Sequence, residues 1–225
     1  MGLDMYLERM PRYRGATASD VSAVESYLDW IDAKENGSEH ANCTFKQWCG
    51  RDNIPTESYI KFYSQFYAKK YSDWDTEHKY GYARIMEQAG YWRKANHIHN
   101  WFVENVQDGE DDCRYHHEVT EEKLKELLDV CNTVLNSCQL VSGQIENGYN
   151  FDDNGNKVYN YIEGNVVADP SVAMELLPTQ SGFFFGGTSY GEWYVDDIRH
   201  TIDIITKVLE TTDFDKEMIY YVSSW

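Results

Sequence analysis

The sequence contains no long apolar run. No stretch of about 18 consecutive apolar residues occurs in the chain, so we expect no membrane-spanning helix. Asp4 and Glu8 interrupt the apolar segment that a secretory signal peptide needs near its N-terminus. An N-myristoylation signal is not expected either, because Tyr6 stands where serine or threonine is required. The sequence therefore predicts a cytoplasmic protein that is not inserted in a membrane.

Basic residues are scarce. The chain has 20 Lys and Arg residues against 38 Asp and Glu residues, which gives a formal net charge of −18. A field of this strength repels phosphates and anionic lipid headgroups, so direct binding to nucleic acid or to a membrane surface is not expected. A protein partner with a basic surface is favoured instead. Solubility alone is the alternative interpretation of such a charge.

The chain has only five cysteines, an odd number without the tight spacing of a disulfide framework. This usage is typical of a reducing cytosol. Enzyme signatures are lacking as well. No local motif supports Cys43 or Cys113 as a nucleophile, and residues 186–189 lack the lysine and spacing of a nucleotide-binding loop. The sequence therefore favours a protein that is not an enzyme.

Aromatic residues, by contrast, are abundant. They make up 15% of the chain, with 18 Tyr and 7 Trp. We expect much of the core to consist of rings, and some rings to line a surface groove or a contact patch.

The spacing of apolar residues predicts six helices. Within each segment, apolar side chains recur three or four residues apart, as on one buried helix face. Thr17 or Ser19 is expected to cap the first helix, and Thr120 the clearest one. The predicted helices run from residue 17 or 19 to about 35, from 56 onward, from about Trp92 to 106, from 120 to about 138, from 170 to 177, and from 190 to about 209.

Strands are expected between these helices. A hairpin is predicted at 144–162, because Asp153-Asn154-Gly155 is typical of a turn. Other strands are expected at 1–7, 82–88, 182–187 and 218–222, with irregular segments at 38–55, 72–81 and 108–118. Helices and strands do not alternate regularly, so the predicted class is α+β. We expect a single domain over residues 1–225, with a mostly antiparallel sheet packed by several amphipathic helices.

The helix predicted from Trp92 carries basic residues and two histidines. His97 and His99 are two residues apart, so on a helix their side chains point about 200° apart and face different surroundings. Arg93 and Lys94 could bind a phosphate, but pairing with nearby acids such as Glu87 or Glu104 is the favoured interpretation.

A metal site is the sharpest chemical hypothesis from the sequence. The short spacer between Cys113 and His116 lets a thiolate and an imidazole reach one zinc or similar ion, and His117 is adjacent. The preceding helix could bring His99 to the same place. In the alternative interpretation, His99 is hydrogen-bonded in the core, Cys113 is apolar packing and their neighbours are solvated.

Acidic residues crowd two regions of the sequence. Carboxylates displayed along a helix can imitate a row of phosphates and occupy a basic channel built for nucleic acid. A solvated acidic face is the alternative. The candidate partner-binding residues are Asp108, Glu110, Asp111, Asp112, Glu118, Glu121, Glu122, Glu126, Glu192, Asp196 and Asp197.

Several motifs carry a family resemblance along nearly the whole chain. They are Met1-Gly-Leu-Asp-Met-Tyr-Leu, Tyr91-Trp-Arg-Lys-Ala-Asn, Ile98-His99, Trp101-Phe-Val103, Asn105-Val-Gln-Asp-Gly109, Leu176-Leu-Pro-Thr, Ser181-Gly-Phe-Phe-Phe-Gly186 and Glu192-Trp-Tyr194. The chain resembles a family of small acidic proteins encoded by phages and prophages. The resemblance implies an anti-CRISPR inhibitor of a type II effector nuclease, acting in the host cytosol. It implies no catalytic residues, and the family's recurring His99 and Cys113 are the first positions to test.

The leading functional hypothesis is therefore an inhibitor that binds a host nucleic-acid enzyme, in particular an RNA-guided CRISPR nuclease, through acidic surfaces that mimic nucleic acid. The alternative is a metal-dependent hydrolase or a metal-stabilised protein with a site around Cys113, His116 and His99. A third hypothesis is an interaction protein with another host target.

Overall fold

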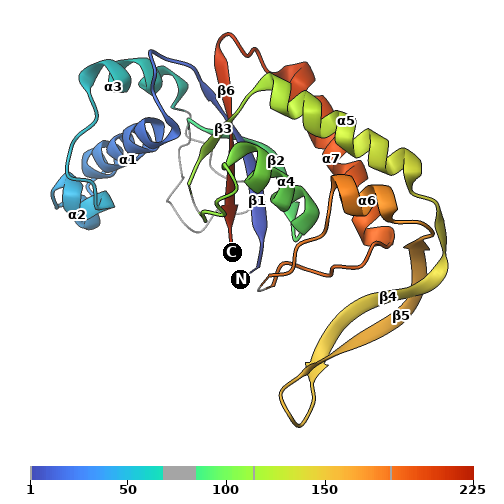
Figure 1. Ribbon diagram of the computed structural model, residues 1–225. Coiled ribbons are helices and arrows are strands. Elements are labelled where there is room, and N and C mark those ends of the chain that lie inside the picture. The colour runs from blue at the N-terminus through green and yellow to red at the C-terminus, as the bar shows by residue number, and fades with distance from the viewer. Residues whose placement is uncertain (1, 68–84, 114, 183) are drawn as a thin grey trace. The chain divides into compact units, whose positions relative to one another are not determined.

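A computed structural model describes residues 2–67, 85–113, 115–182 and 184–225 (Figure 1). The predicted α+β class is confirmed, because helices accompany a four-stranded sheet and a separate two-stranded sheet. In chain order the elements are β1 (Asp4–Pro11), α1 (Ala18–Glu35), η1 (Glu39–Ala41), α2 (Phe45–Cys49), α3 (Glu57–Tyr63), η2 (Ser64–Phe66), β2 (Glu87–Arg93), α4 (Asn96–Val106), β3 (His117–Val119), α5 (Glu121–Ser137), β4 (Leu140–Phe151), β5 (Lys157–Val167), α6 (Ser171–Leu176), α7 (Glu192–Thr211) and β6 (Glu217–Ser224).

The larger sheet has the strand order β2-β1-β6-β3 and is antiparallel. Its β3–β6 pair places His117 opposite Tyr221. The smaller sheet is the β4–β5 hairpin, in which Ile145 lies opposite Ile162. The prediction of a mostly antiparallel sheet is therefore confirmed, and so is the hairpin.

The chain forms two compact units. The first contains residues 1–8, 88–212 and 219–225, and the second contains residues 9–87 and 213–218. The single domain expected over residues 1–225 stays a prediction.

The core of the first unit is rich in rings, as the composition predicted. Leu3, Met5 and Leu7 of β1 are fully buried, because alternate side chains of a strand point to the same face. Phe102 of α4 stacks on Tyr221 of β6 with ring centroids 4.0 Å apart. Aromatic packing thus joins α4 to the sheet.

The second unit contains α1, α2 and α3. Thr17 caps α1 in a capping box with Asp20, whose carboxylate accepts from the Thr17 N–H at 2.8 Å. The helix predicted to end near residue 35 is confirmed. Residues 38–55 are not irregular throughout, because Thr44 and Gln47 form a second capping box that begins α2. That helix has only five residues, too few to show a periodic apolar pattern.

The helix expected from Trp92 begins instead at Asn96. Trp92 belongs to β2 and is buried there, and its indole Nε1 donates to the Thr201 hydroxyl at 2.9 Å. The chain then turns at Lys94, whose φ of 63° is left-handed. β2 overlaps only the end of the strand expected at 82–88. Residues 82–84 and the loop expected at 72–81 lie outside the described residues.

Two further expectations were wrong. The described residues of segment 182–187 form no strand, because this segment turns at Gly186 and is held by a side chain of α4. Conversely, the end of the loop expected at 108–118 belongs to β3, which pairs with β6. This three-residue strand is too short for its alternation to be seen in the sequence. Across the described ranges, no helix has both the length and the apolar character needed to cross a membrane.

Candidate functional site

The two histidines of α4 face different surroundings, as their spacing predicted. His97 lines a cavity, whereas His99 lies in a polar network. Both are buried, with 2% of His97 and none of His99 exposed.

His99 has a polar neighbour near each of its ring nitrogens. Its Nδ1 lies 2.6 Å from the Tyr221 hydroxyl. Its Nε2 lies 3.2 Å from Asp111 Oδ2, in ion-pair range although not aligned as a hydrogen bond. Burial lowers the pKa of His99, and the nearby Asp111 carboxylate opposes that shift. Asp111 also accepts from the Trp225 indole at 3.2 Å, so the network ties the C-terminal residue to the loop after α4.

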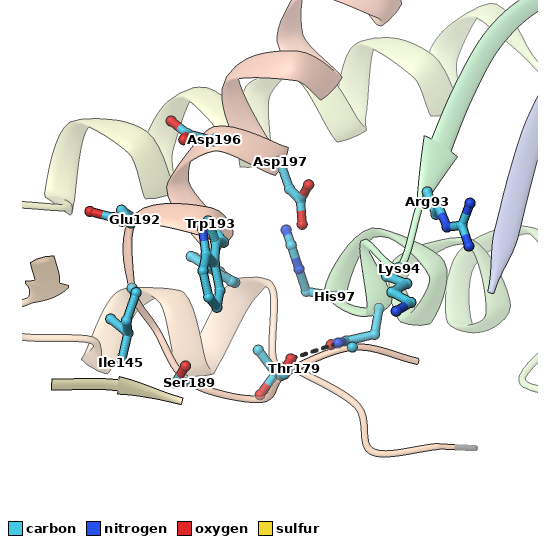
Figure 2. A pocket seen from close by; sticks show the side chains of 15 residues that line it. Arg93, Lys94, His97, Ile145, Thr179, Ser189, Glu192, Trp193, Asp196 and Asp197 are labelled. Atoms are coloured by element: carbon cyan, nitrogen blue, oxygen red, sulfur yellow. Dashed lines mark hydrogen bonds between the residues drawn. The ribbon is translucent and has the colours of Figure 1, made fainter. Parts of the chain in front are cut away.

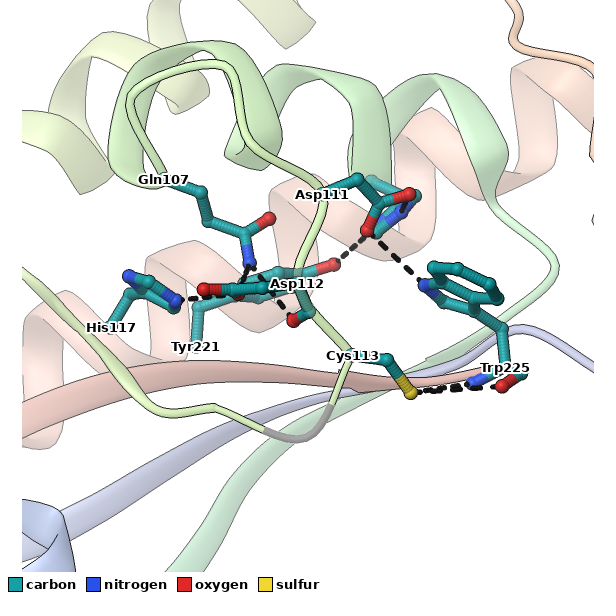
Figure 3. Close-up of polar contacts among 8 residues, drawn as sticks. Gln107, Asp111, Asp112, Cys113, His117, Tyr221 and Trp225 are labelled. Carbon is teal, nitrogen blue, oxygen red and sulfur yellow. Dashed lines mark hydrogen bonds and ion pairs between the residues drawn. The ribbon is translucent and has the colours of Figure 1, made fainter.

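The same loop contains a second set of polar contacts (Figure 3). Asp112 Oδ1 accepts from Gln107 Nε2 at 2.7 Å and lies 2.7 Å from His117 Nε2. The Cys113 thiol donates to the Trp225 carbonyl at 3.6 Å and accepts from the Trp225 N–H at 3.4 Å. These contacts hold the loop against Trp225, so their role is to stabilise the fold.

The four predicted metal ligands do not come together. His99, His117 and Cys113 have the separate partners given above, and His116 Nε2 lies 2.8 Å from Glu8 Oε2. In the part of the chain that the structure describes, no three His, Cys, Asp or Glu side chains are grouped so that they could hold a metal ion. The zinc hypothesis and the hydrolase built on it therefore gain no support from the geometry.

A cavity of about 410 Å³ lies where α4 and α7 begin (Figure 2). Arg93 and Lys94 reach it from the end of β2, and His97 reaches it from the first turn of α4. The first turns of α7 contribute Trp193 and Asp197. A volume of this size is in the range of sites that enclose small molecules.

Asn96 builds one wall of this cavity. Its side-chain amide donates to the Phe185 carbonyl at 3.2 Å and to the Gly187 carbonyl at 2.9 Å, and its oxygen accepts from the Gln180 N–H at 2.9 Å. At Gly186, with φ of 98°, an added Cβ would lie 3.0 Å from the Lys94 carbonyl oxygen. Only glycine suits both this backbone conformation and this close approach. The loop after α6 is therefore held against the beginning of α4.

Arg93 and Lys94 are the basic side chains of the cavity. Their expected pairing with acids such as Glu87 or Glu104 is not found among the described residues, where Glu87 instead contacts Arg9 at 3.0 Å. Among the described residues, Arg93 and Lys94 form no ion pair. Both side chains lie on the same side of the cavity (Figure 2).

Two of the three acids that line the cavity are engaged elsewhere. Glu192 Oε2 accepts from the Asn165 amide at 2.9 Å, and Asp196 forms an ion pair with Arg199 at 2.8 Å. Asp197 is the exception, and its carboxylate points toward His97 (Figure 2). Among the described residues, neither Glu192 nor Asp196 forms an ion pair with Arg93 or Lys94.

His97 and Asp197 have shifted pKa values of opposite direction. Burial lowers the pKa of His97 to about 3, and burial, with Asp196 nearby, raises the pKa of Asp197 to about 7. His97 Nε2 is buried with no hydrogen-bond partner in the described structure, and its ring lies 4.3 Å from the Tyr194 ring. Near neutral pH the cavity thus presents an uncharged imidazole beside a carboxyl group whose pKa is raised toward neutrality.

The predicted acidic face divides into two groups. α5 and α7 pack side by side and run in opposite directions (Figure 1), so the first turn of α5 and the first turns of α7 lie at opposite ends of the helix pair. α5 has 17 residues, which corresponds to about 25 Å of rise. Glu192, Asp196 and Asp197 therefore lie at the cavity, far from the acids of α5.

The acids around the first turn of α5 differ in their ion pairs and in their exposure. Glu121 pairs with Lys125 at 2.6 Å, and Glu126 pairs with Lys123 at 2.8 Å. Asp111 and Asp112 belong to the polar networks described above. The predicted acids that stay exposed on this loop and helix are Asp108, Glu110, Glu118, Glu122 and Glu126.

The β4–β5 hairpin is the most exposed element of the first unit. Ile145 and Val167 are buried at its base, whereas its outer half extends away from the helices of this unit (Figure 1). Cross-strand register places Tyr149 opposite Tyr159, so these rings share a face. That face exposes four large rings: Tyr149 (39%), Phe151 (65%), Tyr159 (44%) and Tyr161 (57%).

Sequence reasoning singled out the hairpin and several residues of the cavity, but it missed the cavity itself. The glycine-rich segment at 186–187 was one available signal, although a plain turn was the natural interpretation. Comparisons with protein-family models, with curated proteins and with solved structures each found no match for this chain.

Proposed function

We propose that this chain is an inhibitor protein that binds a host nucleic-acid enzyme, with an RNA-guided CRISPR nuclease as its first candidate partner, and that the β4–β5 hairpin is its contact element. The observation that carries the proposal is the exposed aromatic face of that hairpin. The phage-protein resemblance of the sequence motifs selects the class of partner.

An uncovered aromatic face is typical of a protein contact. Tyr149 packs edge-on against Phe151 and Tyr159, with centroids 5.5 and 6.1 Å apart, so the rings form one patch. Tyrosine and other aromatic residues are enriched at the centres of protein interfaces. A two-stranded sheet is also marginally stable alone. A partner that covers this face would bury the rings and support the hairpin at the same time.

The charge around the patch favours a basic partner. Residues 140–167 contain four carboxylates, from Glu146, Asp152, Asp153 and Glu163, and one lysine. That lysine, Lys157, has its ammonium 4.3 Å from the centre of the Tyr149 ring. The aromatic patch therefore has an acidic surround, within a chain of net charge −18. Complementary charge accelerates encounter with a basic surface, while the buried rings supply affinity.

Inhibition follows from competition for the same basic surface. A nuclease channel holds nucleic acid chiefly through its phosphate backbone. The exposed carboxylates of Asp108 and Glu110 in the loop and of Glu122 in α5 add to the acidic field that draws such a channel. A protein seated there excludes the DNA by occupying its place, and no catalytic residue of this chain is needed.

The test uses the full chain and a purified type II effector nuclease loaded with its guide RNA. We expect saturable binding in surface plasmon resonance, loss of target-DNA cleavage, and affinity that falls steeply as salt is added. The triple variant Y149S/F151S/Y161S should bind at least a hundredfold more weakly, because each ring is expected to act as an interface anchor.

The matched control is Tyr115→Ser, which removes a ring that is 69% exposed but outside the hairpin. It should bind like the wild-type chain. Failure of the wild-type chain to bind or inhibit the nuclease at low salt would reject this partner. Equal binding by the triple variant and the wild type would reject the hairpin as the contact element.

A further inference from the structure

We propose that the cavity between the beginnings of α4 and α7 binds the phosphate group of a small ligand, with Arg93 and Lys94 as charge partners and His97 as a hydrogen-bonding side chain. This site is independent of the inhibitor function and of the hairpin. Four features of the cavity support this proposal. They are the uncapped N-termini of two helices, the His97 imidazole without a hydrogen-bond partner among the described residues, two basic side chains that form no ion pair there, and the volume of the cavity.

Two helices begin at the cavity without side-chain caps. The N-cap residues are Ala95 for α4 and Gly191 for α7, and neither helix has a side-chain hydrogen bond to its first turn. The first amides of a helix point outward and carry partial positive charge, so anions bind there readily. α4 has 11 residues and α7 has 20, long enough for this effect to develop.

His97 provides the independent sign of a ligand. It is 2% exposed, lines the cavity, and its Nε2 has no hydrogen-bond partner within the described ranges. Buried polar atoms are nearly always hydrogen-bonded, so such an atom at a cavity wall calls for a partner. An oxygen of a bound phosphate would satisfy it. Asp197, which points toward His97, can share the proton of that contact (Figure 2).

The charges in the cavity also suit an anion. Arg93 and Lys94 are exposed at its edge and have no carboxylate partner in the described part of the chain. Asp196 is paired with Arg199, Glu192 accepts from the neutral Asn165 amide and keeps its charge, and the pKa of Asp197 is raised by burial. Arg93 and Lys94 thus present two positive charges at the edge of the cavity, where a phosphate would meet them.

The ligand should be small. The net charge of −18 repels a long polyanion, but that field is screened over about 8 Å at physiological ionic strength. A single phosphate in a cavity of about 410 Å³ is affected mainly by its immediate neighbours. Trp193, 49% exposed and lining the same cavity, offers a flat face on which a ring of the ligand can stack.

The experiment is titration of the full chain with inorganic phosphate, AMP and acetate, followed by isothermal calorimetry and tryptophan fluorescence. We expect saturable, one-to-one binding of phosphate and AMP, with AMP binding more tightly because its base can contact Trp193. Acetate should bind at least tenfold more weakly than phosphate, since it has one charge and fewer acceptor atoms.

Three variants locate the site. Arg93→Ala and Lys94→Ala should each weaken phosphate binding tenfold or more, and both residues are exposed, so the fold should persist. His97→Leu should weaken it as well. The control Lys207→Ala removes an exposed cation of α7 that does not line the cavity, and it should stay within twofold of wild type.

The proposal would be overturned by three results. These are no saturable binding of phosphate or AMP at millimolar concentration, acetate binding as tightly as phosphate, or phosphate binding unchanged in the R93A/K94A double variant. Urea unfolding of each variant checks that any loss is not due to unfolding. Because the hairpin residues are untouched, failure here leaves the inhibitor proposal standing, and the reverse also holds.

Discussion

His97 and His99 come from the same turn of α4, yet they lie in contrasting regions. His99 has the Tyr221 hydroxyl 2.6 Å from one ring nitrogen and Asp111 3.2 Å from the other. The Nε2 atoms of both rings lack an aligned hydrogen bond among the described residues, but that of His99 has the Asp111 carboxylate in ion-pair range, whereas the His97 ring lines the cavity. The polar neighbours of His99 are supplied by the protein itself.

The difference distinguishes buried polar groups that stabilise the fold from buried polar groups that are available to a ligand. A buried polar group that is satisfied within the fold contributes to stability, and its loss leaves partners unpaired. A buried polar group that is not satisfied costs stability and persists where a ligand or a proton transfer uses it. Both histidines look alike in sequence, so their surroundings, rather than their identity, distinguish their roles.

The largest effect is expected from replacing the partnered histidine. His99→Leu leaves the Tyr221 hydroxyl and the Asp111 carboxylate without their imidazole partner, and it should lower the free energy of unfolding by about 3 kcal/mol. The same replacement at His97 removes an unsatisfied atom and should change that free energy by less than about 1 kcal/mol. Urea unfolding of both variants measures the two free energies of unfolding. Equal losses would contradict the difference proposed between the two histidines.

The second prediction concerns how the free energy of unfolding depends on pH. The folded-state pKa of His97, about 3, lies below its ordinary value of 6.5, so its contribution to stability is complete above pH 6.5 and is lost as pH falls. The folded-state pKa of Asp197, about 7, lies above its ordinary value of 3.8, so its contribution is lost as pH rises between those values. Between pH 5 and 6.5 the two slopes oppose each other.

Single variants should reveal each slope. The free energy of unfolding of Asp197→Asn should fall by roughly 2 kcal/mol as pH falls from about 6.5 to about 5, because the opposing pH dependence of Asp197 is then absent. His97→Leu should instead lose a similar amount as pH rises over the same interval. Urea unfolding at a series of pH values measures both. Parallel pH profiles for the two variants would show that these groups do not titrate as described.

A smaller effect is expected at the cavity wall. Asn96→Ala removes the amide that holds the carbonyls of Phe185 and Gly187, and it should cost about 1 to 2 kcal/mol. It should also loosen the loop after α6, which hydrogen exchange of the Gln180 amide would detect. An unchanged exchange rate would mean that this loop keeps its place without Asn96.

The smallest effect is expected on the acidic surface. Glu122→Gln removes an exposed carboxylate of α5 and should leave the free energy of unfolding within about 0.5 kcal/mol. Its effect should appear only in the salt dependence of partner binding. Thermal unfolding provides the check, and a loss above 1 kcal/mol would assign this residue a structural role.

Local chemistry explains which parts of the fold were predictable. Thr17 and Thr120 each cap a helix through a side-chain oxygen, and the turn at Gly155 has the left-handed φ expected of glycine. These signals operate over four or five residues, so they are legible in the sequence. The same holds for the 200° separation of His97 and His99.

Long-range packing explains what was missed. Tyr221 is 122 residues from His99, and Trp225 is 114 residues from Asp111, so neither partner could be inferred from spacing. Trp92 fitted a helical pattern, but it lies in β2, and its indole donates to Thr201, 109 residues away. The cavity depends on two helices beginning side by side, a feature that only the tertiary fold creates.

The contrast between the two histidines is tested most directly by ¹⁵N NMR of their imidazole nitrogens during titration with inorganic phosphate. We predict that the ring signals of His97 shift in a saturable way, while those of His99 stay where its Tyr221 and Asp111 neighbours hold them. Saturable shifts at His99, or unmoved signals at His97 while phosphate is bound, would contradict the assignment of the open cavity to ligand binding and of the closed network to stability.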